Sequence, residues 1–185
     1  LLLPDLEQGR RIDAAILRAA MEATFAASDA TGTWNWKMAY DACEAATVLF
    51  LGRHGAAMRA KAASPADMLS MLTRIASLLP TQTRRSEESE SLQQFSTPIG
   101  LAYVASVAAA ITPADVVLEP SAGTGHLAVL AELAGASLVL NEFAESRAGV
   151  LGQLFPAVST TRFDAAHIND HLDGRIVPSV VLMNP

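Results

Sequence analysis

Short apolar runs alternate with helical segments over the second half of the chain, and this alternation constrains the fold more than any other feature. The apolar runs cover residues 116–119, 137–142, 158–163 and 176–183. Helical patterns lie between these runs, with starts near Gly125 and Ala144. Strands that alternate with helices form parallel sheets with right-handed crossovers. The pattern therefore predicts an α/β fold with a doubly wound, mostly parallel sheet.

The first eighty residues follow a different pattern, because apolar residues recur every third or fourth position and strand formers are sparse. One predicted helix ends at Gly52 and carries an apolar stripe of Trp36, Tyr40, Cys43, Thr47 and Phe50. Another begins with Ser64 as its N-cap and stops at Pro80. We expect three parts: a helical domain over 1–80, a polar linker over 81–93 and an α/β domain over 94–185.

The composition is that of a packed globular protein, with 51% hydrophobic and 17% charged residues. This balance rules out intrinsic disorder. The longest apolar stretch, residues 100–111, is too short to span a bilayer, so no membrane partner is expected. A single cysteine, Cys43, excludes an internal disulfide framework and a zinc site built from cysteines. Such cysteine usage is typical of a reducing compartment, and we expect a cytoplasmic protein.

A glycine-rich turn follows the first predicted strand. Its sequence is Glu119-Pro120-Ser121-Ala122-Gly123-Thr124-Gly125. Gly123 and Gly125 allow positive φ angles and let a ligand approach the backbone at the start of a helix, where free N–H groups favour polar or anionic groups. The same glycines, with Ala128, satisfy a loose dinucleotide fingerprint. The turn alone does not distinguish a dinucleotide from another polar or anionic ligand. It can also be a purely structural turn that binds nothing.

Carboxylates at the ends of three successive strands separate these ligand classes. Glu142 can accept both ribose hydroxyls of an adenosine, and Asp164 is placed to accept from an adenine amino group. Glu119 stands directly before the turn, where it would repel a pyrophosphate but suit an ammonium or a sulfonium. We expect the three side chains to line one crevice. Each of them can alternatively be a solvated loop acid or a helix cap.

With these features the chain resembles the Class I S-adenosylmethionine-dependent methyltransferases, and more narrowly the amino-methyltransferases that modify adenine N6 in DNA. The resemblance rests on residues 94–98 (Gln-Phe-Ser-Thr-Pro), residues 119–125, Asn141-Glu142, residues 163–165 (Phe-Asp-Ala) and Asn184-Pro185. It covers residues 94–185 and implies a Rossmann-like sheet, here ending after strand four, with S-adenosylmethionine as cofactor. The implied cofactor contacts are Phe95, Thr97, Glu119, Pro120, Ser121, Gly123, Gly125, Glu142, Asp164 and Ala165. Thr97 can also serve as a plain N-cap before Pro98.

The resemblance assigns the catalytic role to Asn184 and Pro185, since family members carry Asn or Asp, two prolines and an aromatic after the fourth strand. Hydrogen bonds from the substrate amine to the Asn184 side chain and to the following backbone carbonyl would favour the attacking, pyramidal amine. The aromatic would stack on a base flipped out of its duplex. Here the given sequence stops at Pro185, so we expect a piece of a longer protein that is inactive alone. A turn that simply closes a strand is the alternative.

The whole chain, including residues 34–37 (Trp-Asn-Trp-Lys) and 84–88 (Arg-Arg-Ser-Glu-Glu), also resembles the N-terminal region of bacterial strawberry-notch-like proteins. There a methylase-like domain precedes a helicase-like domain, which implies nucleic acid, most of all DNA, as the partner of the longer protein. The net charge of -6 argues against general nucleic-acid coating and leaves a local basic face open.

Three other functions remain as alternatives. One is methylation of a glutamine amide or an RNA base, and a second is a non-catalytic cofactor-binding module beside a helicase. A nicotinamide-dependent oxidoreductase would explain Gly123, Gly125 and Glu142 but not Asp164 or Asn184.

Several weaker features do not change this hypothesis. His167 and His171 have a metal-ligand spacing, but no third ligand is fixed by the pattern, so no metal is expected. Trp34 and Trp36 are interpreted as core residues rather than as a stacking platform. Cys43 is interpreted as a small buried apolar residue. The apolar run over 176–182 predicts an exposed sheet edge that self-associates or is covered by the helical domain.

Overall fold

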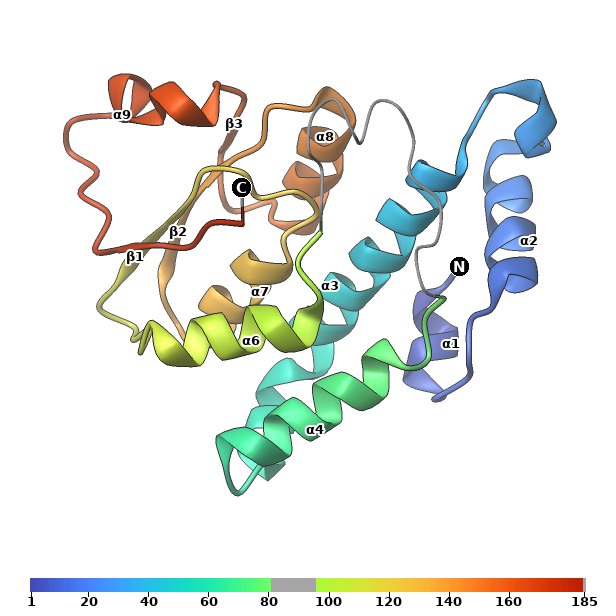
Figure 1. The fold of residues 1–185 in the computed structure, drawn as a ribbon, viewed down its shortest axis with the longest axis horizontal. Coiled ribbons are helices and arrows are strands. Elements are labelled where there is room, and N and C mark those ends of the chain that lie inside the picture. Colours follow the sequence, from blue (N-terminus) through green and yellow to red (C-terminus); the bar gives the residue numbers. More distant parts are fainter. Residues whose placement is uncertain (81–95, 185) are drawn as a thin grey trace.

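The computed structural model describes residues 1–80 and 96–184, which form a mixed α/β structure with a parallel sheet (Figure 1). The helices in these ranges are α1 (Leu3–Glu7), α2 (Ala14–Phe25), η1 (Asp29–Thr31), α3 (Trp36–Lys61), α4 (Pro65–Ala76), α6 (Ile99–Ala108), α7 (His126–Leu133), α8 (Glu145–Leu154), η2 (Ala165–His167) and α9 (Ile168–His171). The strands are β1 (Val116–Glu119), β2 (Ser137–Asn141), β3 (Thr160–Thr161) and β4 (Val180–Val181). The predicted α/β class and parallel sheet are confirmed.

The four strands lie in the order β3-β2-β1-β4, and every neighbouring pair is parallel. Leu118 of β1 pairs with Val139 on one side and with Val181 of β4 on the other. The chain therefore builds outward from β1 to β3 and then returns to the other side of β1. Such a reversal of strand order creates a crevice at the carboxyl ends of the strands.

Two strands are several residues shorter than the sequence predicts, and β2 ends one residue early, at Asn141. The run over 158–163 forms a strand only at Thr160–Thr161, because the N–H of Phe163 donates to the side chain of Asn141 (2.8 Å) and not to a backbone carbonyl. The run over 176–183 forms a strand only at Val180–Val181, and Pro178 just before it has no N–H to donate. The strand at Val116–Glu119 has the predicted bounds.

Helix α3 passes through Gly52, so the prediction that this helix ends there is wrong. A glycine inside a helix costs only about 1 kcal/mol relative to alanine, which tertiary packing readily offsets. A second glycine, Gly55, is buried in the same helix, and a Cβ on it would lie 2.5 Å from the side chain of Leu133 in α7. Gly55 thus lets α3 and α7 pack closely.

The helix caps agree with the sequence in part. Ser64 caps α4 as predicted, because its hydroxyl accepts the N–H of Asp67 at 3.2 Å. The helix ends at Ala76 instead of Pro80, since the following residues continue as tighter turns. The N-cap position of α6 belongs to Pro98, and no side chain caps this helix, so the alternative role of Thr97 as N-cap is not found.

The helical and α/β regions share one hydrophobic core. Val48 and Leu51 of α3 and Leu72 of α4 belong to the same buried cluster as Val117 and Leu140 of the sheet. Helix α3 packs against α7 and α8, and α4 packs against α6 (Figure 1). The helices of residues 1–80 are therefore part of the wall that carries the sheet.

A second cluster surrounds the tryptophans. Trp34 is 1% exposed and its indole N–H donates to the carbonyl of Ala27 at 2.8 Å. Trp36 packs edge-on against Trp34, with ring centroids 6.0 Å apart. Cys43 is buried in the same cluster, and burial raises the pKa of its thiol to about 12. The interpretation of Trp34 and Cys43 as core residues is confirmed.

The last strand is an edge strand with apolar side chains in solvent. Val177, Val181 and Met183 are all more than half exposed, whereas Leu182 is buried. Self-association through this edge stays a prediction. Across residues 1–80 and 96–184, no helix combines the length and the apolar character that crossing a membrane requires.

Candidate functional site

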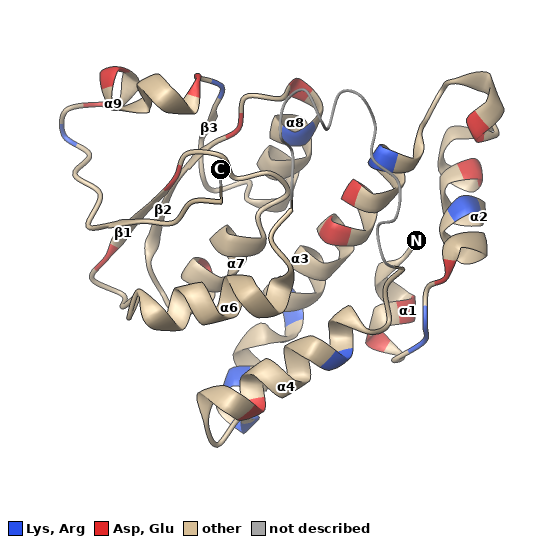
Figure 2. Cartoon of the chain, viewed as in Figure 1, with Lys and Arg blue, Asp and Glu red and all other residues tan. Residues whose placement is uncertain are grey.

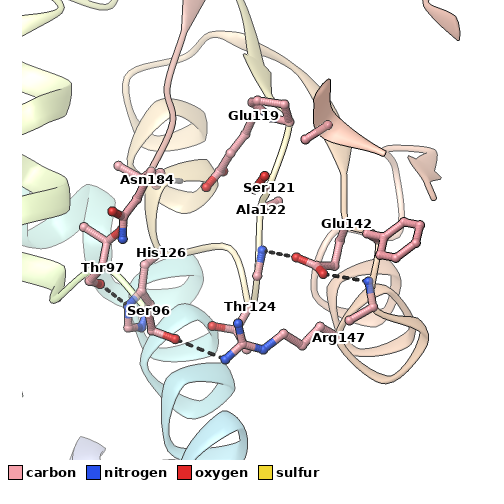
Figure 3. Close-up of a pocket in the computed structure, with 16 residues that line it drawn as sticks. Ser96, Thr97, Glu119, Ser121, Ala122, Thr124, His126, Glu142, Arg147 and Asn184 are labelled. Carbon is pink, nitrogen blue, oxygen red and sulfur yellow. Dashed lines mark hydrogen bonds between the residues drawn. The ribbon is translucent and has the colours of Figure 1, made fainter. Parts of the chain in front are cut away.

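A hollow lies where all four strands end (Figure 3). Its empty volume is about 780 Å³, counting the space open to solvent. Parallel sheets bind ligands on this side, next to the reversal of strand order, which here lies between β1 and β4. The lining residues are Ser96, Thr97, Glu119, Pro120, Ser121, Ala122, Gly123, Thr124, His126, Leu127, Glu142, Phe143, Ala144, Arg147, Ala165 and Asn184.

The turn between β1 and α7, residues 120–125, owes its shape to two glycines. Gly123 and Gly125 have φ angles of +57° and +92°, in the region that favours glycine. A Cβ on Gly125 would lie 2.5 Å from the ring of Phe155. The N–H of Ala122 donates to the carbonyl of Asn141 at 2.9 Å, which ties the turn to the end of β2. The turn is therefore held in place before any ligand binds.

Glu119 carries a buried carboxyl group without a full set of partners. The residue is 2% exposed, and its Oε2 atom is buried with no hydrogen bond among the described residues. Burial raises the pKa of Glu119 well above its usual range; the N–H of Ala128 lowers it in part and the charge of Glu142 raises it further. A cationic ligand group would supply the missing partner.

Glu142 is buried on the other wall of the hollow, and both of its oxygens contact backbone amides. Oε2 accepts the N–H of Gly123 at 2.7 Å, and Oε1 accepts the N–H of Ala144 at 2.8 Å. Each carboxylate oxygen has a second lone pair available for a hydroxyl. Glu142 can thus hold the turn and still accept from a ligand.

Asn141 is a residue that sequence reasoning left without a role. Its side chain is fully buried, and its amide nitrogen donates to the carbonyls of Pro120 and Phe163, each at 2.8 Å. Its amide oxygen accepts from the N–H of Phe163 and from the hydroxyl of Thr161, also at 2.8 Å. One side chain therefore joins the ends of three strands. An asparagine that ends a buried strand was the available signal.

Arg147 is a second residue that the sequence analysis missed. It lies in α8, is 5% exposed, and its Nη2 atom donates to Asp41 of α3 at 2.9 Å and to Ser96 at 3.4 Å. Asp41 also pairs with the buried Lys37 at 3.2 Å. Nothing in the local sequence marks this contact, because Asp41 and Arg147 are far apart in the chain.

Helix α3 reaches the glycine turn directly. Its Glu44 accepts the hydroxyl hydrogen of Thr124 at 2.7 Å. Together with the ion pair between Asp41 and Arg147, this contact makes the helical region a support of the hollow. No motif in residues 1–80 indicates this role in the sequence.

His126, the first residue of α7, also lines the hollow. Its Nδ1 atom lies 2.9 Å from the carbonyl of Thr97, which can only accept, so Nδ1 carries the proton. Its Nε2 atom is buried with no partner among the described residues. In the neutral ring this atom is an acceptor.

The structure brings most of the predicted site residues together. Thr97, Pro120, Ser121, Ala165 and Asn184 line the hollow with Glu119, Gly123 and Glu142, and Gly125 is the N-cap of α7. Figure 3 shows Glu119 and Asn184 on neighbouring parts of the wall. Phe95 and Pro185 lie outside the described residues.

Asp164 does not line the hollow. It is exposed and accepts the N–H of Ala166 at 3.0 Å as the cap of η2. This placement matches the alternative in which the residue is a helix cap. Its predicted contact with an adenine would require a different side-chain position.

The two histidines with metal-ligand spacing are exposed, and the His171 ring stacks on Phe163 with centroids 4.1 Å apart. Within residues 1–80 and 96–184, no three His, Cys, Asp or Glu side chains gather in a way that could hold a metal ion. Histidine pairs of this spacing need a third ligand before they bind a metal tightly.

Comparisons with known proteins return nothing for this chain. No family model, no curated protein and no solved structure matches it. The chemistry of the hollow must therefore be inferred from its own residues. Two buried glutamates, one arginine and an asparagine suit a ligand that carries a cationic group, hydroxyls and an anionic group.

Proposed function

We propose that this protein binds S-adenosylmethionine in the hollow and transfers its methyl group to an amino group, with adenine N6 in DNA as the substrate we favour. The observation that carries the proposal is the buried, partly unpaired carboxyl of Glu119 beside the glycine turn. The strand order β3-β2-β1-β4 supports it, because that order is half of a Rossmann-like sheet.

The residues of the hollow fit the parts of this cofactor. Glu119 suits the ammonium of the methionine part, since a buried carboxylate strongly favours an opposite charge at hydrogen-bond distance. Glu142 ends β2 and keeps lone pairs for the ribose hydroxyls. The backbone of Gly123 allows close approach, because its nearest neighbour on the side of a Cβ is Arg147 at 3.7 Å.

When bound, the cofactor supplies a methyl group on a sulfonium, which is an electrophile. Asn184 follows β4 and lines the same hollow as Glu119. Its side-chain oxygen can accept a hydrogen bond from a substrate amine and so favour the pyramidal form that attacks. Most of the catalytic effect would come from holding the amine in line with the methyl group.

A DNA substrate needs a basic surface. Basic residues gather at the carboxyl end of α3 and on α4, namely Arg59, Lys61 and Arg74, away from the strand ends (Figure 2). Among the described residues that line the hollow, Arg147 is the sole Lys or Arg. RNA or a glutamine amide is the alternative substrate.

The cofactor is tested by thermal-shift titration with S-adenosylmethionine, S-adenosylhomocysteine and NAD in parallel. A ligand that binds only the native state adds about 2.7 kcal/mol at a hundred times its Kd. We expect stabilisation by both adenosyl ligands and none by NAD. A response to NAD alone would contradict the proposal and favour an oxidoreductase.

The substrate is tested with tritium-labelled S-adenosylmethionine in the natural full-length protein, offered duplex DNA, RNA and a glutamine-containing peptide. We expect label in DNA adenine, and loss of at least about 100-fold in Asn184→Ala, because one positioned hydrogen bond in a transition state is worth about that factor. Label in RNA or peptide would move the proposal to the alternative substrate. Cofactor binding without any transfer would favour a non-catalytic module.

A further inference from the structure

Arg147 forms an ion pair with Asp41 and keeps N–H donors that this pair does not use. Among the described residues, Asp41 is the one carboxylate at hydrogen-bond distance from Arg147, and Asp41 is shared with Lys37. Both hydrogen bonds that Arg147 makes to described residues use Nη2, and its buried Nε atom has no partner in residues 1–80 and 96–184. A guanidinium has five N–H donors, so this one is far from satisfied.

Other acids near Arg147 are already engaged elsewhere. Glu44 accepts from Thr124, and Glu142 accepts from Gly123 and Ala144. Burial lowers the pKa of Arg147, but the charges of Asp41, Glu44 and Glu142 raise it by more, so the side chain stays cationic. The guanidinium therefore keeps N–H donors that no described carboxylate uses, and a further anion can accept from them.

The guanidinium lies along the hollow, on the side of the glycine turn. Its Nη1 atom would be 3.7 Å from a Cβ on Gly123, and Figure 3 shows the side chain running beneath the turn toward Ser96. Glu119 occupies another part of the wall (Figure 3). The hollow therefore offers a carboxylate and a guanidinium on different parts of its wall, with charges opposite to those of the ammonium and the carboxylate of an α-amino acid.

We propose that Arg147 recognises the α-carboxylate of the amino-acid part of the ligand, which makes it a specificity-determining residue of the hollow. This inference rests on the proposed function, because it takes the ligand to be an adenosyl amino acid. Lys37 keeps Asp41 paired when the guanidinium turns part of its donors to the ligand. The sequence motifs of the site do not contain Arg147.

The test compares two ligands that differ in one group, S-adenosylhomocysteine and its decarboxylated amine, by calorimetry on the same protein. Both carry the adenosine and the ammonium, so only the carboxylate differs. We expect wild type to bind the decarboxylated ligand about 10- to 100-fold more weakly, the range of a charged hydrogen bond. In Arg147→Gln the two affinities should become equal, with that for the decarboxylated ligand unchanged.

Arg162→Gln is the matched control, because Arg162 is exposed and does not line the hollow. It should keep the wild-type ratio. The triple variant Lys37→Gln/Asp41→Asn/Arg147→Gln removes every charge of this buried cluster and should give the same loss if the single variant fails to fold. Equal binding of both ligands by wild type would overturn the role of Arg147 and leave the adenosyl site intact. Failure of wild type to bind either ligand would overturn both proposals together.

Discussion

A buried carboxyl group with one oxygen that has no partner among the described residues, such as that of Glu119, makes the stability of a protein depend on pH. The folded-state pKa of Glu119 is raised above the unfolded value of about 4.3. A raised acid pKa contributes stability that is complete below the unfolded pKa and is lost as the pH rises through the folded pKa. Glu119 therefore destabilises the ligand-free protein at neutral pH and above.

Glu119→Gln should separate stability from ligand binding. We expect the variant to unfold at about the same urea concentration as wild type at pH 4, and to be more stable by roughly 1–3 kcal/mol at pH 8, because the carboxyl ionises freely in unfolded wild type there and its burial opposes ionisation in the folded state. The same variant should lose the stabilisation by S-adenosylhomocysteine. Glu145→Gln, at a side chain that is 85% exposed, is the control and should change neither. Lower stability of Glu119→Gln at pH 8 would show that the carboxylate is well solvated.

Asn141 offers a test of how the strand ends are held. Asn141→Leu keeps a similar volume but leaves the carbonyls of Pro120 and Phe163 without their donor. We expect a loss of about 2–4 kcal/mol in the free energy of unfolding, measured in urea. Asn169→Leu, on exposed α9, should stay within about 0.5 kcal/mol of wild type. Equal effects of the two substitutions would contradict the role of Asn141 in joining the strand ends.

At the scale of elements, local pattern predicted some boundaries and missed others for physical reasons. β1 has its predicted bounds because all of Val116–Glu119 pairs with β2, and Val117 and Leu118 also pair with β4 on the other side. β3 and β4 are shorter because a side chain replaces a backbone partner in one and a proline precedes the other. The sequence around Gly52 does not show that α7 packs against α3 at Gly55, one turn further along. This packing stabilises α3 beyond Gly52.

The two glycines of α3 give opposite predictions. Gly52 is exposed with nothing within 4 Å of an added Cβ, so Gly52→Ala should stabilise the protein by up to about 1 kcal/mol. Gly55→Ala places a Cβ 2.5 Å from Leu133 and should destabilise it by roughly 1–3 kcal/mol. Thermal unfolding followed by circular dichroism measures both. Stabilisation by both substitutions would mean that Leu133 of α7 does not lie close to Gly55 of α3.

At the scale of the whole molecule, the shared core decides how the chain unfolds. Leu51 and Leu72 of the helical region are fully buried against the sheet's helices, and Asp41 pairs with Arg147 across the same boundary. Helix α3 runs through both clusters as one element. We expect one cooperative transition in urea, seen together by tryptophan fluorescence, which reports on Trp34 and Trp36, and by circular dichroism. Two separated transitions would instead support independent domains.

The candidate site was partly predictable at this scale. Residues that follow strands could be assigned to one edge of a parallel sheet, and Glu119, Glu142 and Asn184 do meet there. Contacts made from a distant helix could not be assigned, because the position of Asp41 and Glu44 depends on how α3 packs and not on any local pattern. Asp164 was assigned to the site from its place after a strand, but its side chain caps η2 and does not line the hollow.

The most direct test of the proposed cofactor site is a crystal structure of the protein grown with S-adenosylhomocysteine. We predict the ligand in the hollow at the strand ends, with its ammonium at Glu119, its ribose hydroxyls at Glu142 and its carboxylate at Arg147. A ligand bound elsewhere, or an adenosyl group in the hollow that touches neither glutamate, would contradict the assignment of these residues to cofactor binding.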